Sequence, residues 1–149
     1  MPILFSTIDY ASPEYDECLA LRYRVLRAPL GLDYTEAQIA EEWEHHHFAA
    51  FLESGELAAY LMLEMLPQRV AKMRQVAVKP ELQSMGIGSG LVRFSEEWSK
   101  QQGLLSIVMH ARKEAVPFYE RMGYEVRGKE FLEVGIPHFK MEKTLSPKN

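Results

Sequence analysis

The sequence predicts a mixed α/β (α+β) domain in which helices flank a central, mostly antiparallel sheet. Three observations lead to this prediction. Three strand-like runs separated by short turns fill 47–78, which is typical of an antiparallel meander. From residue 86 the apolar spacing changes to that of an amphipathic helix. A nearly unbroken apolar run at 104–109 then has the pattern of a central strand that is covered on both faces.

The size and composition are those of one ordinary globular domain. The chain has 149 residues, of which 47% are hydrophobic and 26% are charged. We assign 1–145 to a single domain and 146–149 to a tail. Seventeen Lys and Arg against 21 Asp and Glu give a net charge of −4, so we expect no nucleic-acid partner.

Cysteine and histidine usage predicts no metal site. Cys18 is the only cysteine, which excludes an intrachain disulfide and a multi-cysteine metal centre. His45, His46 and His47 are consecutive, so on a strand they cannot converge on one ion, and we expect a solvated loop that leads into a strand.

We expect a cytoplasmic location without membrane association. The first residues have neither the basic nor the apolar region of a secretory signal. The longest apolar run starts at Leu57 and is interrupted by Glu64, well short of the roughly 20 residues needed to cross a bilayer.

The first elements are a strand and two helices. The β-branched run at 3–8 is typical of a strand, and Ser12 followed by Pro13 predicts the start of a helix that reaches about Arg27. Thr35 caps a second, shorter helix over 35–43.

The meander follows as strands at 47–53, 56–66 and 69–78. Alternation along the third strand places Val76 on one face and Gln75, together with Met73, on the other.

The second half alternates helices and strands. A buried stripe predicts a helix from Gly86 to the residues before Gly103, and a shorter helix covers 114–122 with Gly123 as its C-cap. Strands at 124–131 and 138–144, joined through 135–137, close the sheet. The predicted order is β-α-α-β-β-β-α-β-α-β-β.

The turn at 83–90 contains three glycines at the start of a helix. Backbone N–H groups and the helix dipole favour an anion at such a place, and a pyrophosphate is the natural guest. No Lys-Ser or Lys-Thr follows these glycines, so the turn is no P-loop. Leu91 and Arg93 occupy the positions where a dinucleotide-binding fingerprint needs glycine. A tight turn that binds no ligand is the alternative interpretation.

Two motifs resemble signatures of one family. Residues 83–88, Gln-Ser-Met-Gly-Ile-Gly, resemble the Gln/Arg-x-x-Gly-x-Gly/Ala signature of the GNAT superfamily of acyl-CoA N-acyltransferases. Residues 115–124 resemble its second signature, Ala-x-x-Phe-Tyr-x-x-x-Gly-Phe/Tyr. The motifs stand in the right order, and the resemblance extends over nearly the whole chain. It implies a sheet whose fourth and fifth strands splay apart to form a cleft.

The resemblance implies a coenzyme A site and no metal. The backbone amides of 83–88 would hold the pyrophosphate, and the strand at Val76 and Val78 would pair with the pantetheine arm. Arg112 departs from the Asn of many family members. The implied contacts are Val76, Ala77, Val78, Gln83, Ser84, Met85, Gly86, Ile87, Gly88, Ser89, Gly90, Arg112, Phe118, Tyr119 and Arg121.

The resemblance also implies direct attack of an amine on acetyl-CoA. Tyr119 would protonate the departing thiolate, and the Val76 N–H would stabilise the oxyanion. For the general base we prefer His138 to His110, and a chain of ordered water is the alternative.

The resemblance implies that the acceptor is a primary amine of a small molecule or a peptide. Arg22 and Arg24 are candidates to bind an acceptor carboxylate, and Glu41, Glu42 and Glu44 to bind an ammonium, with ordinary surface charge as the alternative. A non-catalytic acyl-CoA-binding regulatory module on the same fold is the alternative function. Exposed strand edges are compatible with a homodimer.

Overall fold

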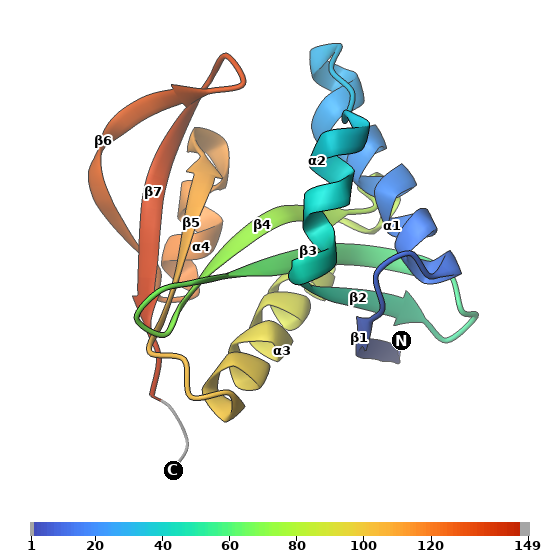
Figure 1. The fold of residues 1–149 in the computed structure, drawn as a ribbon, viewed down its shortest axis with the longest axis horizontal. Coiled ribbons are helices and arrows are strands. Elements are labelled where there is room, and N and C mark those ends of the chain that lie inside the picture. The colour runs from blue at the N-terminus through green and yellow to red at the C-terminus, as the bar shows by residue number, and fades with distance from the viewer. Residues whose placement is uncertain (1, 147–149) are drawn as a thin grey trace. The chain divides into compact units, whose positions relative to one another are not determined.

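A computed structural model of the chain describes residues 2–146, and it confirms the predicted fold class (Figure 1). Seven strands follow the order β1-β2-β3-β4-β5-β7-β6. β4 and β5 pair in parallel, whereas β1 with β2, β2 with β3, β5 with β7 and β6 with β7 pair antiparallel. The order of helices and strands is the predicted one. Apart from Ser146, the predicted tail at 146–149 lies outside the described residues.

The chain divides into two compact units. The first comprises Met1–Glu64 and Gln75–Ser95, and the second comprises Met65–Arg74 and Glu96–Asn149. Three elements, β3 (Leu57–Leu66), β4 (Val70–Val78) and α3 (Ile87–Gln101), contribute residues to both.

The first unit also contains β1 (Ile3–Ile8), α1 (Pro13–Arg22), α2 (Glu36–Ala40) and β2 (His46–Leu52). The predicted caps are confirmed. The Ser12 hydroxyl accepts the Tyr15 N–H, and Thr35 forms a capping box with Gln38. The α-helix ends at Arg22, and a π-helical turn at Tyr23–Arg27 completes the predicted span.

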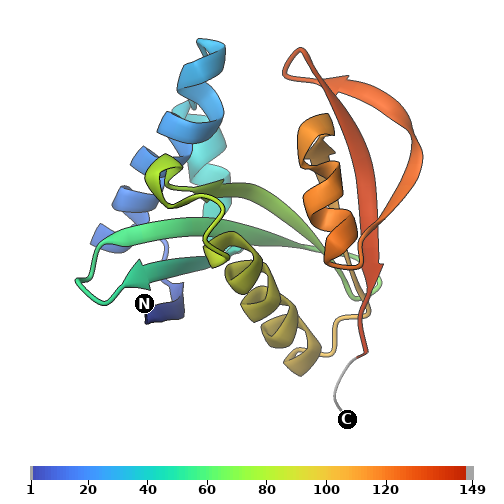
Figure 2. The same ribbon diagram turned by 180° about the vertical axis from the view of Figure 1, so that it is seen from behind.

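Side chains alternate along β2 in the first unit, so that its two faces contact two different helices. Ala49 packs with Cys18 of α1, whereas the neighbouring Phe48 contacts Phe94 of α3 at 6.2 Å between ring centroids. Figures 1 and 2 accordingly show α1 and the start of α3 on opposite sides of β2 and β3. Residues of both strands are therefore buried on both faces, and the core of this unit sits around β2 and β3.

The second unit contains β5 (Ser106–Arg112), α4 (Val116–Arg121), β6 (Glu125–Glu133) and β7 (Ile136–Thr144). β6 and β7 extend further toward each other than the sequence predicts, and only residues 134 and 135 separate them. Val134 and Gly135 both have positive φ, at 46° and 78°, as a type I′ hairpin turn requires. This tight turn sets the pairing of 131–133 with 136–138, and the register of the two strands shifts between Arg127 and Phe131.

The backbone of β4 is irregular at one residue. Ala71, Met73 and Ala77 are buried, whereas Gln75, which the predicted alternation places on their face, is partly exposed. Its backbone is left-handed with φ of 59°, and one such residue interrupts an extended strand. The irregularity lies directly before Val76.

Within the part of the chain that the structure describes, no helix has the length and hydrophobicity needed to cross a bilayer. The same residues contain no group of three or more metal-ligating side chains.

Candidate active site

The glycine-rich turn connects β4 to α3 in the first unit, and Figure 2 shows this path from behind. A short 3-10 turn at Pro80–Leu82 is followed by left-handed backbone at Ser84 and Gly86, with φ of 68° and 82°. The side-chain amide nitrogen of Gln83 donates to the carbonyl of Val78 at 3.2 Å and so holds the turn against the end of β4. Two left-handed residues thus redirect the chain into the helix.

The start of α3 presents several backbone donors. The first intrahelical bond runs from the Gly90 N–H to the Gly86 carbonyl at 3.0 Å. The N–H groups of Ile87, Gly88 and Ser89 precede that bond, so the helix itself supplies no acceptor for them. Three donors at the positive end of a helix dipole are chemically suited to an anion such as a diphosphate.

Gly90 has a packing role that the sequence did not reveal. Its N–H is used in the helix, and a β-carbon at this position would lie 2.6 Å from Cζ of Phe5. The missing side chain therefore allows β1 and α3 to approach closely. The predicted contribution of Gly90 to a phosphate site stays a prediction.

The two arginines predicted to bind an acceptor lie in different surroundings. The Arg24 guanidinium pairs with Glu81 at 2.7 Å, with about half of each side chain exposed. The Arg22 side chain has an exposed fraction of 0%, and its two terminal nitrogens bind the two carboxylate oxygens of Glu42 at 2.6 and 2.7 Å. A carboxylate ligand would have to displace Glu42, so Arg22 is part of the interior.

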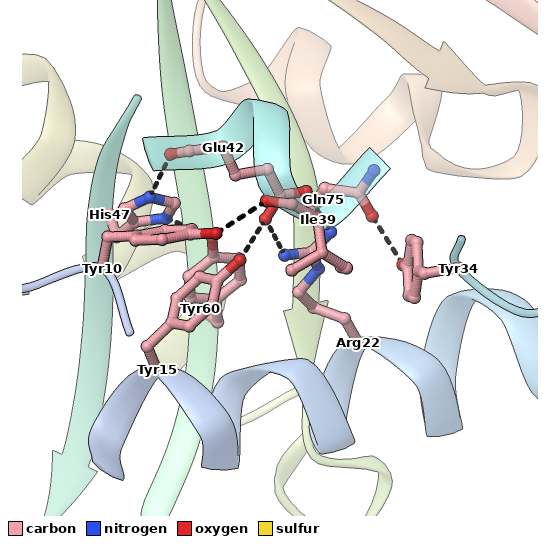
Figure 3. Close-up of polar contacts among 9 residues, drawn as sticks. All are labelled: Tyr10, Tyr15, Arg22, Tyr34, Ile39, Glu42, His47, Tyr60 and Gln75. Atoms are coloured by element: carbon pink, nitrogen blue, oxygen red, sulfur yellow. Dashed lines mark hydrogen bonds and ion pairs between the residues drawn. The ribbon is translucent and has the colours of Figure 1, made fainter. Parts of the chain in front are cut away.

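A buried polar cluster surrounds this ion pair (Figure 3). The Tyr15 hydroxyl donates to Glu42 at 2.7 Å, and burial together with the carboxylate raises the pKa of that phenol. Burial would raise the pKa of Glu42, but the bonds from Arg22 and Tyr15 lower it below its ordinary value. Glu42 is therefore held as a carboxylate inside the first unit.

His47 belongs to the same cluster, and of the three consecutive histidines expected in a solvated segment that leads into a strand, it is the one that is buried. Its Nε2 lies 2.9 Å from the Glu42 carbonyl and its Nδ1 lies 2.6 Å from the Tyr60 hydroxyl. Only Nε2–H can donate to a carbonyl, so Nδ1 accepts from Tyr60. Burial lowers the pKa of His47, and the ring is neutral. The strand begins at His46, one residue earlier than predicted, and His47 is its first buried residue.

Tyr34 contacts the irregular residue of β4. Its hydroxyl donates to the side-chain carbonyl of Gln75 at 2.7 Å, and the guanidinium groups of Arg22 and Arg27 lie 4.7 and 4.6 Å from its ring centroid. Val76, the predicted oxyanion donor, follows Gln75 directly. The segment between α1 and β2 thus holds the strand next to that backbone amide.

Tyr119 lies on α4 in the second unit. Its side chain is buried, and the Phe118 and Tyr124 rings lie 5.0 and 5.7 Å away. Burial raises the pKa of the phenol above its ordinary value. Its backbone carbonyl accepts the N–H groups of Met122 and Tyr124, and Gly123 between them is left-handed with φ of 95°. The C-cap of α4 is thus Met122, one residue before the predicted Gly123, and Gly123 takes the left-handed position directly after the cap.

The two histidines considered as a general base lie in the second unit, and Glu133 connects them. The Glu133 carboxylate lies 2.9 Å from Nδ1 of His110 and 3.7 Å from Nε2 of His138. Glu133 was missed by the sequence analysis. No local pattern marks it, because its place depends on the register of the β6–β7 hairpin.

The predicted site residues therefore fall into two groups. The first unit holds Arg22, Arg24, Val76, Ala77, Val78 and the whole 83–90 turn. The second unit holds Arg112, Phe118, Tyr119, Arg121 and His138. Within the second group, the strand register pairs Arg112 directly with His138.

Comparison with known sequences identifies the family. The family model described as acetyltransferase (GNAT) domain matches residues 28–145. YjcF of Bacillus subtilis, described as an uncharacterised N-acetyltransferase, is 36% identical over 73 residues, which cover 48% of this chain and 52% of the relative. The uncharacterised YyaT of the same organism is 36% identical over 76 residues, 51% of each chain. The chain thus spans about half the length of these curated relatives.

Solved structures share the fold over nearly the full chain. A Lactobacillus plantarum protein, provisionally assigned as an N-acetyltransferase, has a TM-score of 0.82 and 26% identity, covering 95% of this chain and 99% of the other. The PaiA N-acetyltransferase of Thermoplasma acidophilum, solved in complex with coenzyme A, has a TM-score of 0.75 at 17% identity and covers 97% and 99%. At that identity the likeness concerns the fold alone. The family match over most of the sequence shows that this chain belongs to the GNAT acetyltransferase family.

Proposed function

We propose that this protein is an acetyl-CoA-dependent N-acetyltransferase that acetylates a primary amine of a small molecule or peptide by direct attack. The observation that carries the proposal is the turn at 83–90, where left-handed Ser84 and Gly86 lead into the N–H groups that begin α3. Those donors and the helix dipole suit the diphosphate of coenzyme A. Membership of the GNAT acetyltransferase family supports the same function.

In this proposal two further residues act on the thioester. The backbone N–H of Val76 stabilises the oxyanion that forms when the amine attacks the carbonyl carbon. The Tyr119 phenol gives its proton to the sulfur as the C–S bond breaks. A phenol is protonated at neutral pH even at its ordinary pKa, and burial raises the pKa of Tyr119 further, so the proton is present on the oxygen before the C–S bond breaks. The homodimer and the cytoplasmic location stay predictions.

Release of free thiol from acetyl-CoA, measured with a panel of polyamines, amino acids and short peptides, tests the proposal. We expect at least one amine to accelerate thiol release, and Tyr119→Phe to lower kcat by about 100-fold, the lower end of general acid–base effects. Tyr23→Phe is the matched control, because Tyr23 is an exposed tyrosine of the first unit. If the protein binds coenzyme A and no amine accelerates thiol release, it is a binding module and the proposed activity is refuted.

A further inference from the structure

Glu133 lies between two histidines on one face of the second unit. It is the last residue of β6, and the tight turn at 134 and 135 returns the chain to β7. Its Oε1 lies 2.9 Å from Nδ1 of His110 on β5, and its Oε2 lies 3.7 Å from Nε2 of His138 on β7. One carboxylate thus lies close to two imidazoles that come from two different strands.

The contacts around His110 determine its tautomer. A carboxylate only accepts hydrogen bonds, so the proton of a neutral His110 must lie on Nδ1, which donates to Glu133. The lone pair of the ring is then on Nε2. The Phe131 ring packs edge-on against His110 at 5.0 Å between centroids and restricts its rotation. The ring is thus fixed in the form that accepts a proton at Nε2.

His138 plays a different part in the same cluster. Its Nδ1 lies 2.9 Å from the carbonyl of Ile136, and the exposed fraction of its side chain is 5%, against 30% for His110. Its remaining nitrogen faces Glu133. A neutral His138 gives its one N–H to the Ile136 carbonyl and so has none left for Glu133, whereas His110 is the more exposed histidine, which a substrate can reach.

The ionisation of Glu133 suits this role. Burial would raise the pKa of its carboxyl, but the hydrogen bond and charge of His110, followed by the charges of His138 and Lys72, lower it below its ordinary value. The carboxylate is charged at neutral pH.

Charged groups from β4, β5, β6 and β7 lie on the face of the sheet that carries Glu133, His110 and His138. Lys72 of β4 pairs in register with Val108, two residues before His110 and on the same face. Lys140 and Glu142 of β7 pair with His110 and Val108. Arg127 of β6 pairs with Lys140, and its Nε lies 3.5 Å from the Glu142 carboxylate. Glu133 of β6, His138 of β7 and Arg112 of β5 are further charged or titratable groups on this face.

We propose that Glu133 is a positioning residue that holds His110 with Nδ1 protonated, so that His110 Nε2 is the general base for the acceptor amine. This inference rests on the proposed N-acetyltransferase function and replaces His138 by His110 as the base. Glu133 itself does not touch the acceptor.

The proton balance is simple. The acceptor ammonium gives one proton to His110 Nε2, and the free amine attacks the thioester carbonyl carbon of acetyl-CoA. The C–N bond forms, the C–S bond breaks, and the nitrogen loses its second proton. Tyr119 gives its proton to the coenzyme A sulfur and regains one of the two protons lost from nitrogen, and the other passes to solvent, leaving an amide and a free thiol.

Steady-state kinetics test the role, with acetyl-CoA and the best amine of the panel as substrates. We expect His110→Gln to lower kcat/KM for the amine by about 100-fold or more, as loss of a general base does.

Glu133→Gln removes the charge and should lower kcat about tenfold to 100-fold while the KM for acetyl-CoA stays the same. Glu133→Asp should restore part of the loss, because the carboxylate is kept. Glu130→Gln on the same strand, which loses only an exposed pair with Lys113, is the control.

The pH profile separates positioning from structural damage. Glu133→Gln removes a negative charge beside His110, so the imidazolium loses a partner and the acid-side inflection of kcat/KM should move to lower pH. An unmoved inflection with an unchanged kcat would refute the positioning role.

A tautomer measurement keeps the inference testable without activity. Long-range ¹H–¹⁵N NMR of the wild-type protein should show His110 with the proton on Nδ1, and Glu133→Gln should shift the signals toward a mixture. A wild-type proton on Nε2 refutes the inference even if amines are acetylated. A correct tautomer without turnover of any amine instead refutes the proposed function, and with it the catalytic role of His110.

Discussion

Arg22 and Glu42 show how residue identity alone can mislead. Both are charged residues of segments that would be expected at the surface, yet both are buried and joined by two hydrogen bonds, with Tyr15 as a third partner of the carboxylate (Figure 3). The Arg22 Nε, although buried, has no hydrogen-bond partner among the described residues. A buried pair is costly to desolvate and more costly to break, because one partner is then left alone.

Glu42→Gln should therefore lower the free energy of unfolding by about 3–5 kcal/mol, since it leaves the Arg22 charge buried without a counter-ion. Urea denaturation measures this loss. Glu81→Gln, which breaks the exposed pair with Arg24, should cost less than about 1 kcal/mol. The double change Arg22→Met with Glu42→Leu should recover most of the stability. Equal losses for Glu42→Gln and Glu81→Gln would contradict the assignment of a structural role to the buried pair.

At the scale of elements, β4 and the turn after it depend on left-handed backbone. Gln75 within the strand, and Ser84 and Gly86 in the turn, all have positive φ. Two of the three carry a β-carbon, which makes this conformation costly and means that the surroundings must hold it. The Tyr34–Gln75 hydrogen bond is one such restraint.

Gly86→Ala tests the turn. The space around Gly86 is open, so the added methyl meets nothing, but φ of 82° should cost about 1–2 kcal/mol of stability. Relief of that strain would redirect the N–H groups, and loss of one charge-assisted hydrogen bond should weaken coenzyme A binding about tenfold. Calorimetry with coenzyme A measures the affinity.

Gly55→Ala is the matched control for this change. Gly55 is also left-handed, with φ of 91° and open space around it, but it lies in the β2–β3 hairpin turn. The substitution should cost similar stability and leave the affinity for coenzyme A unchanged. Equal weakening by both variants would show that the effect on binding comes from stability alone.

Element order and the glycine turn were predictable, because periodicity and motif residues are local. Gln75 was not, since glutamine carries no signal for left-handed backbone and the strand pattern around it is regular. Arg22 was not, since its burial depends on a partner that is distant in the sequence. Glu133 lacked any signal for the same reason: its neighbours His110 and His138 are set by the pairing of β5, β6 and β7. The two local motifs were enough to suggest the family, whereas the polar clusters around Glu42 and Glu133 could be found only from the tertiary structure.

At the scale of the whole molecule, the number and state of the cysteines bear on the reaction path. A two-step path through an acetylated thiol needs a thiolate, and Cys18 is the only cysteine of the chain. It is fully buried in the core formed with Leu21, Tyr60 and Met62, and burial raises its pKa to about 12. At neutral pH almost none of this thiol is ionised, so it is a poor nucleophile.

Cys18→Ala should therefore leave kcat and both KM values within about twofold of wild type, with a stability loss of about 1 kcal/mol from the missing sulfur. Initial rates with varied acetyl-CoA and amine should give intersecting lines, as expected when both substrates bind before any product leaves. Mass spectrometry after incubation with acetyl-CoA alone should find no acetyl group on the protein. Parallel lines, or an acetylated Cys18 that disappears when the amine is added, would contradict direct attack and require a covalent intermediate on this thiol.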